Sequence, residues 1–288
     1  MRQTADLYCV LGNPIAHSRS PAIHARFAEL TGERIRYERR LLPIDGFARG
    51  LRDFAAQGGR GCSVTVPFKT EALRCATACS ERAQLAGAAN TLSLHADGSI
   101  SADNTDGLGL VADITRNAGI ALAGCDVLLV GAGGAAAGVL GPLLHAGVRH
   151  ITVANRTLAK AQALVQSHSA LAAQRKTQLK ACDLRAPLVD FDIIINASAS
   201  SLAGADVPVP ASVLRPASLA YDMMYGPAAQ GFLDWARRHG ARPRDGLGML
   251  VEQAAEAFWL WRGLRPPSAQ VLAELQEAAA KPASGADR

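Results

Sequence analysis

Short apolar runs alternate with longer amphipathic stretches along most of the chain. Runs of about four to eight apolar residues between turn residues predict buried strands, and stretches with a period near 3.6 predict helices. Two short segments, 90–95 and 99–102, flank an Asp-Gly pair, which predicts a β-hairpin. The pattern predicts further strands at residues 7–11, 35–42, 62–66, 126–130, 151–154, 193–197 and 219–223.

Capping residues and prolines define the intervening helices. Ser20 as N-cap and Pro21 in the first helical position predict a helix that ends at Gly32. Asp45 is the predicted cap of a second helix, and Pro67 opens a third that carries Lys69. Further helices are predicted from 105 or 106 to 119, from 227 to 240, from about 246 onward and from 268 to 280, with a frayed tail at 281–288.

The order of these elements predicts the fold class and its division. After residue 126 strands and helices alternate regularly, which is typical of a parallel, doubly wound sheet. The predicted architecture is therefore α/β, with a doubly wound sheet in the second part of the chain. Two domains suit a chain of 288 residues.

Charge and cysteine usage exclude several function classes. The 30 basic and 25 acidic residues give a net charge of +5, and the basic residues are spread out, so no nucleic-acid-binding arm is predicted. The six cysteines form no C-x-x-C pair and no zinc-type cluster with histidine, which predicts reduced thiols and no metal site.

One segment is open to a different interpretation. Residues 127–144 carry no charge over 18 positions, close to the length of a membrane span. Five glycines and Pro142 interrupt this run, and three of the glycines form a nucleotide-binding motif. We therefore predict a strand, a turn and a helix here rather than a membrane helix.

That motif has the composition of a dinucleotide-binding turn. Following the strand at 126–130, the run Gly131-Ala132-Gly133-Gly134-Ala135-Ala136 fits G-x-G-x-x-A. Gly131 permits a tight turn, Gly133 lets backbone N–H groups approach a pyrophosphate, and Ala136 keeps the helix close to the sheet. The alternative is a Gly/Ala-rich helix packed in a core.

The end of the next strand indicates which dinucleotide binds. An NAD site usually offers a carboxylate there to the ribose 2′-hydroxyl. Here the strand ends in Asn155-Arg156-Thr157, and Lys160 follows one turn later. Arg156 can pair with a 2′-phosphate, and Asn155 and Thr157 can donate hydrogen bonds to it. The sequence therefore predicts NADP(H), the alternative being ordinary surface charge at a helix start.

Four polar clusters outside the nucleotide segment lie where predicted elements end, which is the usual position of ligand-binding groups. They occupy residues 13–21, 64–69, 89–91 and 103–107. Together with the glycine-rich turn, Asn155-Arg156-Thr157, and the segments 221–225 and 245–253, they follow one another in an order that resembles the shikimate dehydrogenase family. The resemblance extends over essentially the whole chain. It implies a Rossmann-type nucleotide domain at 106–245 and a discontinuous α/β substrate domain formed by segments 1–105 and 246–288.

The resemblance implies roles for individual residues. Lys69 and Asp106 are the implied catalytic pair, and lysine is a suitable proton donor to a ketone oxygen while aspartate positions it. Without the family, Lys69 could be a solvated helix charge and Asp106 a helix N-cap. The resemblance implies that Ser18 and Ser20 bind the carboxylate of the substrate. It implies that the ring hydroxyls are bound by Thr65, Asn90, Asp106 and Gln253. Lys69 and Tyr225 are also implied to contact the substrate. Gln253 could instead be an exposed helix residue, and Tyr225 a core aromatic.

The resemblance also implies cofactor contacts outside the turn, and two departures from the family pattern. The implied contacts are Ala197, Ser198, Met223, Gly246 and Met249. Lys160 stands where many relatives have arginine, which weakens bidentate phosphate contacts. Residues 196–201 read Asn-Ala-Ser-Ala-Ser-Ser instead of an Asn-Ala-Thr start with glycine in the sixth position, which affects the loop beside the nicotinamide.

The implied activity is the reversible NADPH-dependent reduction of 3-dehydroshikimate to shikimate, on the route to chorismate and aromatic amino acids. A cytoplasmic enzyme, monomeric or homodimeric, without nucleic-acid or membrane partners, is expected. One alternative is a quinate or mixed quinate/shikimate dehydrogenase, whose members often use NAD. The other is a catalytically silent NADP sensor, which has no need of a proton donor.

Overall fold

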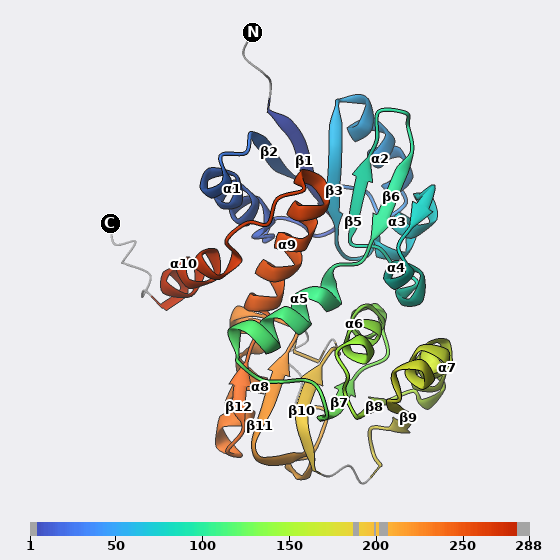
Figure 1. Cartoon of the computed structure of the whole chain (residues 1–288), viewed down its shortest axis with the longest axis vertical. Helices are drawn as coiled ribbons and strands as arrows, with labels where there is room; N and C mark the ends of the chain where they lie inside the picture. The colour runs from blue at the N-terminus through green and yellow to red at the C-terminus, as the bar shows by residue number, and fades with distance from the viewer. Residues whose placement is uncertain (1–4, 187–189, 199, 202–206, 281–288) are drawn as a thin grey trace.

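The computed structural model describes residues 5–186, 190–198, 200–201 and 207–280. These residues form two α/β halves, each built on its own six-stranded sheet. In Figure 1 the first half lies above the second, and the helices α5 and α9 lie between them. This arrangement confirms the predicted α/β class.

The first sheet is mixed and has the strand order β2-β1-β3-β5-β6-β4. Strand β1 lies parallel to both of its neighbours, whereas β5 and β6 form the predicted antiparallel hairpin. The strands are β1 (Asp6–Gly12), β2 (Ile35–Leu41), β3 (Gly59–Val64), β4 (Ala78–Cys79), β5 (Thr91–Leu94) and β6 (Ile100–Asp103). The helices of this half are α1 (Ser20–Thr31), α2 (Phe47–Ala56), α3 (Lys69–Cys75) and α4 (Glu81–Ala86).

The second sheet has the order β12-β11-β10-β7-β8-β9, and all of its pairs are parallel. Counted from β7, this is the 3-2-1-4-5-6 order of a Rossmann fold, whose ligand crevice lies where the order reverses, between β7 and β10. The strands are β7 (Asp126–Val130), β8 (His150–Asn155), β9 (Gln178–Asp183), β10 (Phe191–Asn196), β11 (Leu214–Asp222) and β12 (Arg242–Arg244). The helices are α6 (Gly134–His145), α7 (Leu158–Arg175) and α8 (Gln230–Arg238), with 3₁₀ turns at Ala211–Val213 and Gly226–Ala229.

Two helical segments cross between the halves. The first is α5 (Asp106–Ala112), which continues as one π-helical stretch, Asp113–Asn117. The second is α9 (Leu247–Arg262), which packs along α5 and returns the chain to the first sheet. There the Trp261 indole donates to the Leu92 carbonyl at 3.0 Å and stacks on Tyr8. Helix α10 (Ser268–Ala280) then packs against α9.

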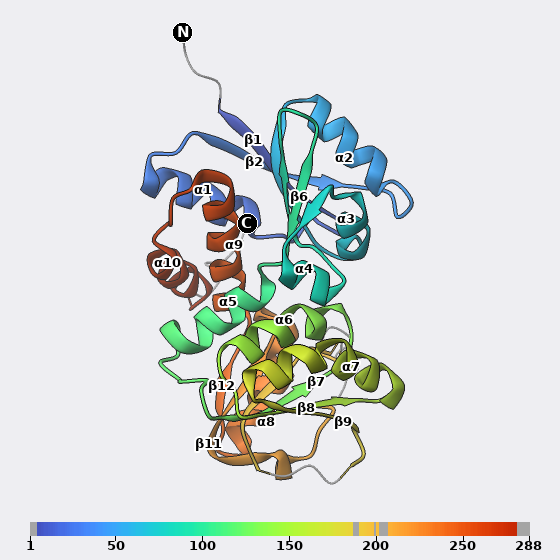
Figure 2. The same cartoon turned by 45° about the vertical axis from the view of Figure 1, so that its right-hand side comes forward.

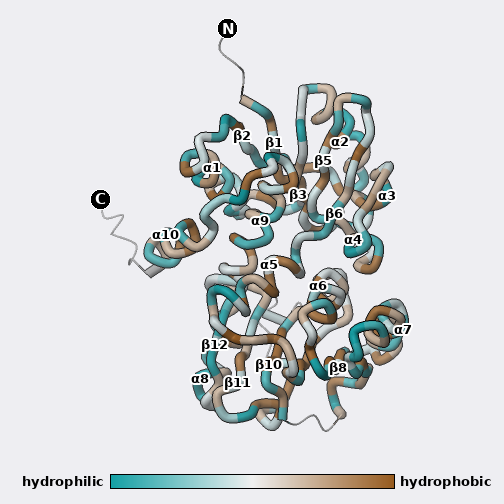
Figure 3. Tube along the Cα trace, in the orientation of Figure 1, coloured by the Kyte–Doolittle hydropathy of each residue, from teal (hydrophilic) through white to brown (hydrophobic). Residues whose placement is uncertain are grey.

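Each sheet is covered on both faces. Buried residues of α6 and α7 pack on one face of the second sheet, and residues of α8 pack on the other. In the first half, α2 and α3 cover one face, while α1, α9 and α10 share a cluster on the opposite side. Figure 3 shows hydrophobic and hydrophilic positions interleaved around the outer helices, as expected for elements with one buried face.

A buried carboxylate fastens both crossings to the second sheet. Asp113, in the π-helical stretch, is fully buried and accepts two bonds from Arg244, at 2.5 and 2.8 Å. It also accepts from the Tyr221 hydroxyl at 2.8 Å. The backbone of α9 passes so close that a Cβ on Gly248 would lie 1.8 Å from an Asp113 oxygen. A π-bulge of this kind often marks a functional position in a helix.

Several predicted boundaries are wrong for local reasons. Ser20 is not an N-cap; Arg19 is, and the Ser20 N–H donates to Ser18 Oγ, although Pro21 does occupy the first turn. Asp45 does not cap α2, which begins after Gly46. The segment after Pro227 starts as a 3₁₀ turn before α8 begins. Strands β3 and β11 both begin earlier than predicted.

Four short elements were not predicted at all: β4, α4, β9 and β12. The tail 281–288 lies outside the described residues. The uncharged run 127–144 divides into β7 and α6, as predicted. Across the described part of the chain, no helix is long and apolar enough to cross a membrane.

The close approach of α9 to Asp113 predicts the effect of a methyl group. Gly248→Ala should destabilise the protein by about 1–3 kcal/mol, because the added carbon must displace a buried, ion-paired carboxylate. Gly231→Ala in α8 is the matched control, since its Cβ meets nothing within 4 Å; it should stabilise by about 0.5–1 kcal/mol. Urea unfolding measures both, and a neutral Gly248→Ala would contradict the proposed crowding.

Burial of a histidine predicts a pH dependence of stability. His24 is fully buried and stacks on Tyr37 at 4.2 Å, and desolvation lowers its pKa from 6.5 to about 3. Between these values the unfolded chain binds a proton that the folded chain does not, so stability falls as the pH falls below 6.5. His24→Phe should reduce this slope by about 1.4 kcal/mol per pH unit. Phe27 is also fully buried and packs edge-on against His24. Phe27→Leu should therefore lower stability at every pH and leave the pH slope unchanged, because it changes packing and not a titratable group. An unaltered slope in His24→Phe would refute the assignment.

Candidate active site

Lys69 and Asp106 come together where the two halves meet. Lys69 begins α3 in the first half and Asp106 begins α5. The Lys69 ammonium lies 2.5 Å from Asp106 Oδ2. The lysine side chain is only 28% exposed, so it is not a solvated helix charge. Asp106 is buried and does not cap α5, because the N-cap position is Thr105. The two residues therefore form an ion pair at the interface.

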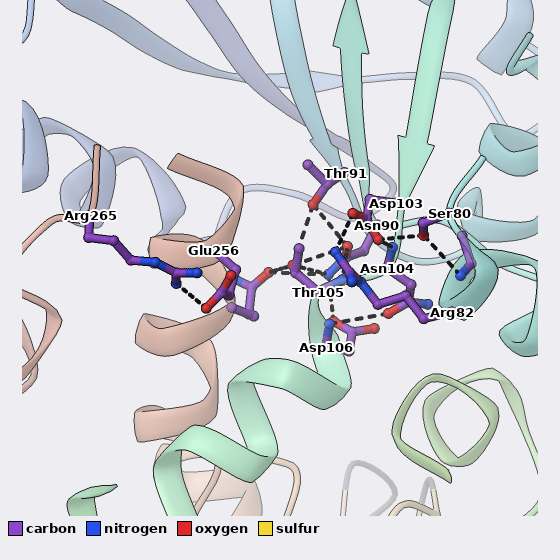
Figure 4. Close-up of polar contacts among 12 residues, drawn as sticks. Ser80, Arg82, Asn90, Thr91, Asp103, Asn104, Thr105, Asp106, Glu256 and Arg265 are labelled. Carbon is purple, nitrogen blue, oxygen red and sulfur yellow. Dashed lines mark hydrogen bonds and ion pairs between the residues drawn. The ribbon is translucent and has the colours of Figure 1, made fainter. Parts of the chain in front are cut away.

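Asn90 holds the other oxygen of this carboxylate. Its amide nitrogen donates to Asp106 Oδ1 at 2.8 Å, and its amide oxygen accepts from the Thr105 N–H at 2.9 Å. Because a backbone N–H can only donate, the contact to Thr105 fixes the orientation of the amide and directs the NH₂ group toward Asp106. Figure 4 shows Asn90 above Asp106 with Thr105 beside them. Asn90 is itself buried.

Gln253 reaches the same cluster from α9. Its amide oxygen accepts from Asn90 Nδ2 at 3.2 Å and from Thr105 Oγ1 at 3.4 Å. Its amide nitrogen donates to the Leu250 carbonyl. Gln253 is therefore half-buried in a network rather than an ordinary exposed helix residue. Four of the predicted site residues, Lys69, Asp106, Asn90 and Gln253, are thus joined by direct contacts.

Residues that the sequence analysis did not single out position Asp106. Asn104 Oδ1 accepts from the Asp106 N–H at 3.1 Å, and Asn104 Nδ2 donates to the Ala88 carbonyl. Asp103 accepts from the Asn104 N–H and from Arg82, both shown in Figure 4. The only signal in the sequence was that these residues belong to the polar run 103–107, which does not distinguish a support from a ligand-binding group.

Ser18 and Ser20 lie at the entrance to α1. The Ser18 carbonyl accepts two bonds from Arg39 on the edge strand β2, at 2.9 and 2.6 Å, which fixes the loop. Ser18 is half-buried and Ser20 is buried. Within the described residues, no hydrogen bond links either serine to the Lys69–Asp106 pair.

Thr65 and Tyr225 each follow a strand, one in the first half and one in the second. Thr65 follows β3, and its N–H donates to the Leu11 carbonyl at the end of the adjacent strand. Tyr225 follows β11, is half-buried and packs against the cluster formed by α1 and α9. Burial raises the pKa of its hydroxyl. The Arg19 guanidinium lies 5.8 Å from the Tyr225 ring, so the loop of the first half touches the second half here.

The glycine-rich turn has the predicted geometry. Gly131 follows β7 with a φ of +109°, a conformation that L-residues rarely adopt. A Cβ there would also lie 3.0 Å from the Ala197 carbonyl. Gly133 is the N-cap of α6, and Cβ atoms on Gly133 or Gly134 would meet nothing within 4 Å. The first turn of α6 therefore presents free N–H groups to open space, which suits a pyrophosphate.

The turn also contains a buried anchor and two accessible residues. Ala136 is fully buried, which brings α6 close to the sheet as expected, whereas Ala132 is half-buried and Ala135 exposed.

The adjacent strand end fits a phosphate. Arg156 and Lys160 are exposed, and neither forms an ion pair with any residue that the structure describes. Asn155 occupies the end of β8 and donates to the Thr157 carbonyl. The nearest carboxylate on the neighbouring strand is Asp183, whose charge is compensated by Arg185 at 3.0 Å. Within the described residues, Arg156 and Lys160 are therefore both exposed cations without an ion-pair partner at this strand end.

The remaining predicted cofactor residues gather around the same crevice. The Ala197 N–H donates to the Val130 carbonyl, and the Met223 N–H donates to the Asn196 carbonyl, so both lie at the carboxyl ends of central strands. A Cβ on Gly246 would lie 2.3 Å from the Met223 carbonyl. Ser198 donates to Asn196 Oδ1, and Met249 is buried beside them in the core of this half. The loop 196–201 differs from the family pattern, and its residue 199 lies outside the described residues.

Comparisons with known proteins decide the family. Family models match three parts of the chain: the shikimate dehydrogenase substrate binding domain at residues 10–92, shikimate / quinate 5-dehydrogenase at 113–205, and the shikimate 5′-dehydrogenase C-terminal domain at 246–276. A protein of Verminephrobacter eiseniae named shikimate dehydrogenase (NADP(+)) is 99% identical over all of both chains. The chain belongs to the shikimate dehydrogenase family. The suspected resemblance is thereby confirmed.

Further relatives and solved structures are similar to this chain in sequence or fold. An Acidovorax protein named shikimate dehydrogenase (NADP(+)) is 73% identical over 97% of this chain and 99% of its own. A Thermus thermophilus shikimate 5-dehydrogenase, solved with NADP(H) and shikimate, is 32% identical with a TM-score of 0.83, covering 95% and 99% of the two chains. An Ael1 enzyme from Pseudomonas putida is 44% identical with a TM-score of 0.86, covering 94% and 98%.

Proposed function

We propose that this chain is an oxidoreductase that acts on a CH–OH group and catalyses the reversible NADPH-dependent reduction of 3-dehydroshikimate to shikimate. Shikimate precedes chorismate and the aromatic amino acids. The observation that carries the proposal is the ion pair between Lys69 and Asp106 at the interface of a Rossmann half and a second half. The family, and the name carried by relatives at 99% and 73% identity, support the same substrate and cofactor.

The reaction needs a hydride at the carbonyl carbon and a proton at the carbonyl oxygen. Bound NADPH supplies the hydride. Lys69 donates the proton to the oxygen in the direction of reduction and removes it from the hydroxyl in the direction of oxidation. Asp106 holds the lysine ammonium at 2.5 Å, and Asn90 in turn holds Asp106. The proton donor is therefore fixed in place before the substrate binds.

The substrate residues follow from the chemistry of a hydroxylated ring acid. Ser18 and Ser20 donate hydroxyl hydrogens to the carboxylate. Thr65, Asn90, Asp106 and Gln253 exchange hydrogen bonds with ring hydroxyls, and each unmatched buried polar group would weaken binding. Tyr225 borders both the substrate and the nicotinamide ring.

For NADP(H), the N–H groups of the turn 131–136 hold the pyrophosphate, and the open space over Gly133 and Gly134 fits it. Arg156 pairs with the 2′-phosphate, assisted by Asn155, Thr157 and Lys160. The nicotinamide half lies against the residues at the opposite side of the crevice, Ala197, Ser198, Met223, Gly246 and Met249.

We assign residues 1–105 and 246–288 to a substrate domain and residues 106–245 to the NADP domain. The two separate sheets and the return of α9 to the first sheet support this division. The active site then lies in the crevice between the domains, which close over the ligands. We place the enzyme in the cytoplasm as a monomer or homodimer.

Removing the proton donor tests the mechanism. Lys69→Ala should reduce kcat by roughly 10²–10⁴-fold, the usual contribution of general acid–base catalysis, with a smaller effect on NADPH binding. Steady-state kinetics and a fluorescence titration of NADPH measure the two effects. Wild-type turnover in the variant would remove Lys69 from the reaction.

Removing the unpaired guanidinium tests cofactor choice. Arg156→Ala should weaken NADPH binding by about 1.5–3 kcal/mol, the contribution of a hydrogen bond to a charged group, and leave NADH binding nearly unchanged. Arg185→Ala is the control, because Arg185 is exposed near the neighbouring strand end but is already paired with Asp183. It should weaken NADPH binding less than Arg156→Ala does. Equal losses for both cofactors in Arg156→Ala would show that Arg156 does not recognise the phosphate.

A matrix of activities discriminates between the alternatives. Shikimate and quinate should each be assayed with NADP⁺ and with NAD⁺. The highest kcat/KM is expected for shikimate with NADP⁺. A preference for quinate with NAD⁺ would favour a quinate dehydrogenase, and the absence of turnover with every pair would favour a sensor.

A further inference from the structure

A cavity lies at the junction of the two halves, between three helices. It has a volume of about 440 Å³, within the usual range of small-molecule sites. Helices α4, α5 and α6 form its walls, and Figure 2 shows these three helices next to one another at the junction. None of Lys69, Asp106, Asn90 and Gln253 lines it. Its lining includes Glu81, Arg82, Leu85, Leu108, Val111 and His145.

One lining residue has an unused hydrogen-bond donor. The Nε atom of Arg82 is buried and has no hydrogen-bond partner within the described structure. A second nitrogen of the same guanidinium, Nη2, donates to Asp103 Oδ2 at 2.5 Å. Nε itself is closed to solvent, but the Arg82 side chain as a whole is 32% exposed. A ligand carboxylate in the cavity would therefore meet the exposed part of the guanidinium, where a hydrogen bond to a charged group contributes about 1.5–3 kcal/mol.

The rest of the lining restricts the chemistry of the ligand. His145 adds a second basic side chain and Glu81 supplies a carboxylate, so the polar part of the cavity carries both kinds of group. Leu85, Leu108 and Val111 provide an apolar wall. A carboxylate beside Arg82, an ammonium beside Glu81 and an apolar side chain against the leucines would satisfy all of these surfaces. That combination describes an apolar α-amino acid.

A chain of hydrogen bonds connects this cavity to the catalytic carboxylate. Arg82 donates to Asp103, which accepts from the Asn104 N–H; Asn104 Oδ1 then accepts from the Asp106 N–H. Figure 4 shows Arg82, Asp103, Asn104 and Asp106 in this arrangement. A ligand carboxylate that draws Arg82 away from Asp103 would therefore loosen the segment that positions Asp106.

We propose that the cavity between α4, α5 and α6 is a regulatory site for an apolar α-amino acid, and that its occupation lowers turnover. The carboxylate binds Arg82 and His145, and the ammonium binds Glu81. The binding does not depend on the proposed reaction; only the effect on turnover rests on it.

Calorimetry with three probes tests the binding. L-phenylalanine should bind one to one. 3-Phenylpropanoate lacks the ammonium and 2-phenylethylamine lacks the carboxylate. The Kd of each should exceed that of L-phenylalanine by about tenfold or more, as expected for one lost charge-assisted hydrogen bond. Ala146→Trp, which fills the cavity from its rim, should abolish binding. Ala96→Trp, on the exposed hairpin turn of the first half, is the matched control and should bind like the wild type.

The outcomes separate the proposals. Absence of binding by all three probes, equal affinities for them, or undiminished binding to Ala146→Trp would overturn the site. In the reduction assay, saturating L-phenylalanine should lower kcat in the wild type and in Ala96→Trp but not in Ala146→Trp. Binding without this change in kcat would overturn the regulatory role. A protein that binds L-phenylalanine but has no dehydrogenase activity would contradict the proposed reaction and leave the site standing.

Discussion

The carboxylate of Asp106 is the point on which the two halves of this protein depend. It is the first residue of the helix that leaves the first sheet, and it is buried between an ammonium and an amide NH₂ group. A buried carboxylate without such partners would be strongly unfavourable, so its partners must be ordered whenever the chain is folded. The need to pair this carboxylate therefore orders Lys69, Asn90 and the loop before Asp106 together with helix α5.

This requirement explains why the site is assembled from distant segments. Asn90 follows α4, Lys69 begins α3 and Gln253 lies in α9, yet Asn90 contacts both Asp106 and Gln253 directly. The β5–β6 hairpin brings Asn90 beside the residues that precede α5, and the return of α9 brings Gln253 to them. The polar groups meet because the ends of the elements meet, as is usual for ligand sites on rigid scaffolds.

Most of the fold could be predicted from the sequence because the strongest signals are local. The glycine-rich turn between β7 and α6 depends on the φ of Gly131, which the residue type itself reveals. The Asp-Gly hairpin is a similar case. Strands β9 and β12 were missed because their residues are only partly apolar: β9 contains Lys180 and Asp183, and β12 is Arg-Pro-Arg. Their pairing comes from tertiary contacts, which override propensity.

The site was predictable to a lesser degree. Lys69 and Asp106 were identified through a family resemblance, and their mutual distance could be learned only from the structure. The supporting contacts of Asn104 and Asp103 had no signal beyond polarity, because a residue that positions another looks like any loop residue in a single sequence. The capping role given to Ser20 failed for a related reason: the N-cap is Arg19, and Ser18 Oγ, two positions before Ser20, accepts from the Ser20 N–H.

Asp113 has a consequence for how the molecule can move. Its carboxylate receives Arg244 and Tyr221 from the second sheet, and α9 passes against it at Gly248. Since both covalent crossings are held to the second sheet at this one point, a displacement of either crossing must disturb the contacts of the other. Two ligands bound on either side of the crossings would therefore act on the same set of contacts. Each ligand must change the affinity for the other by the same factor, a thermodynamic linkage that needs no direct contact between them.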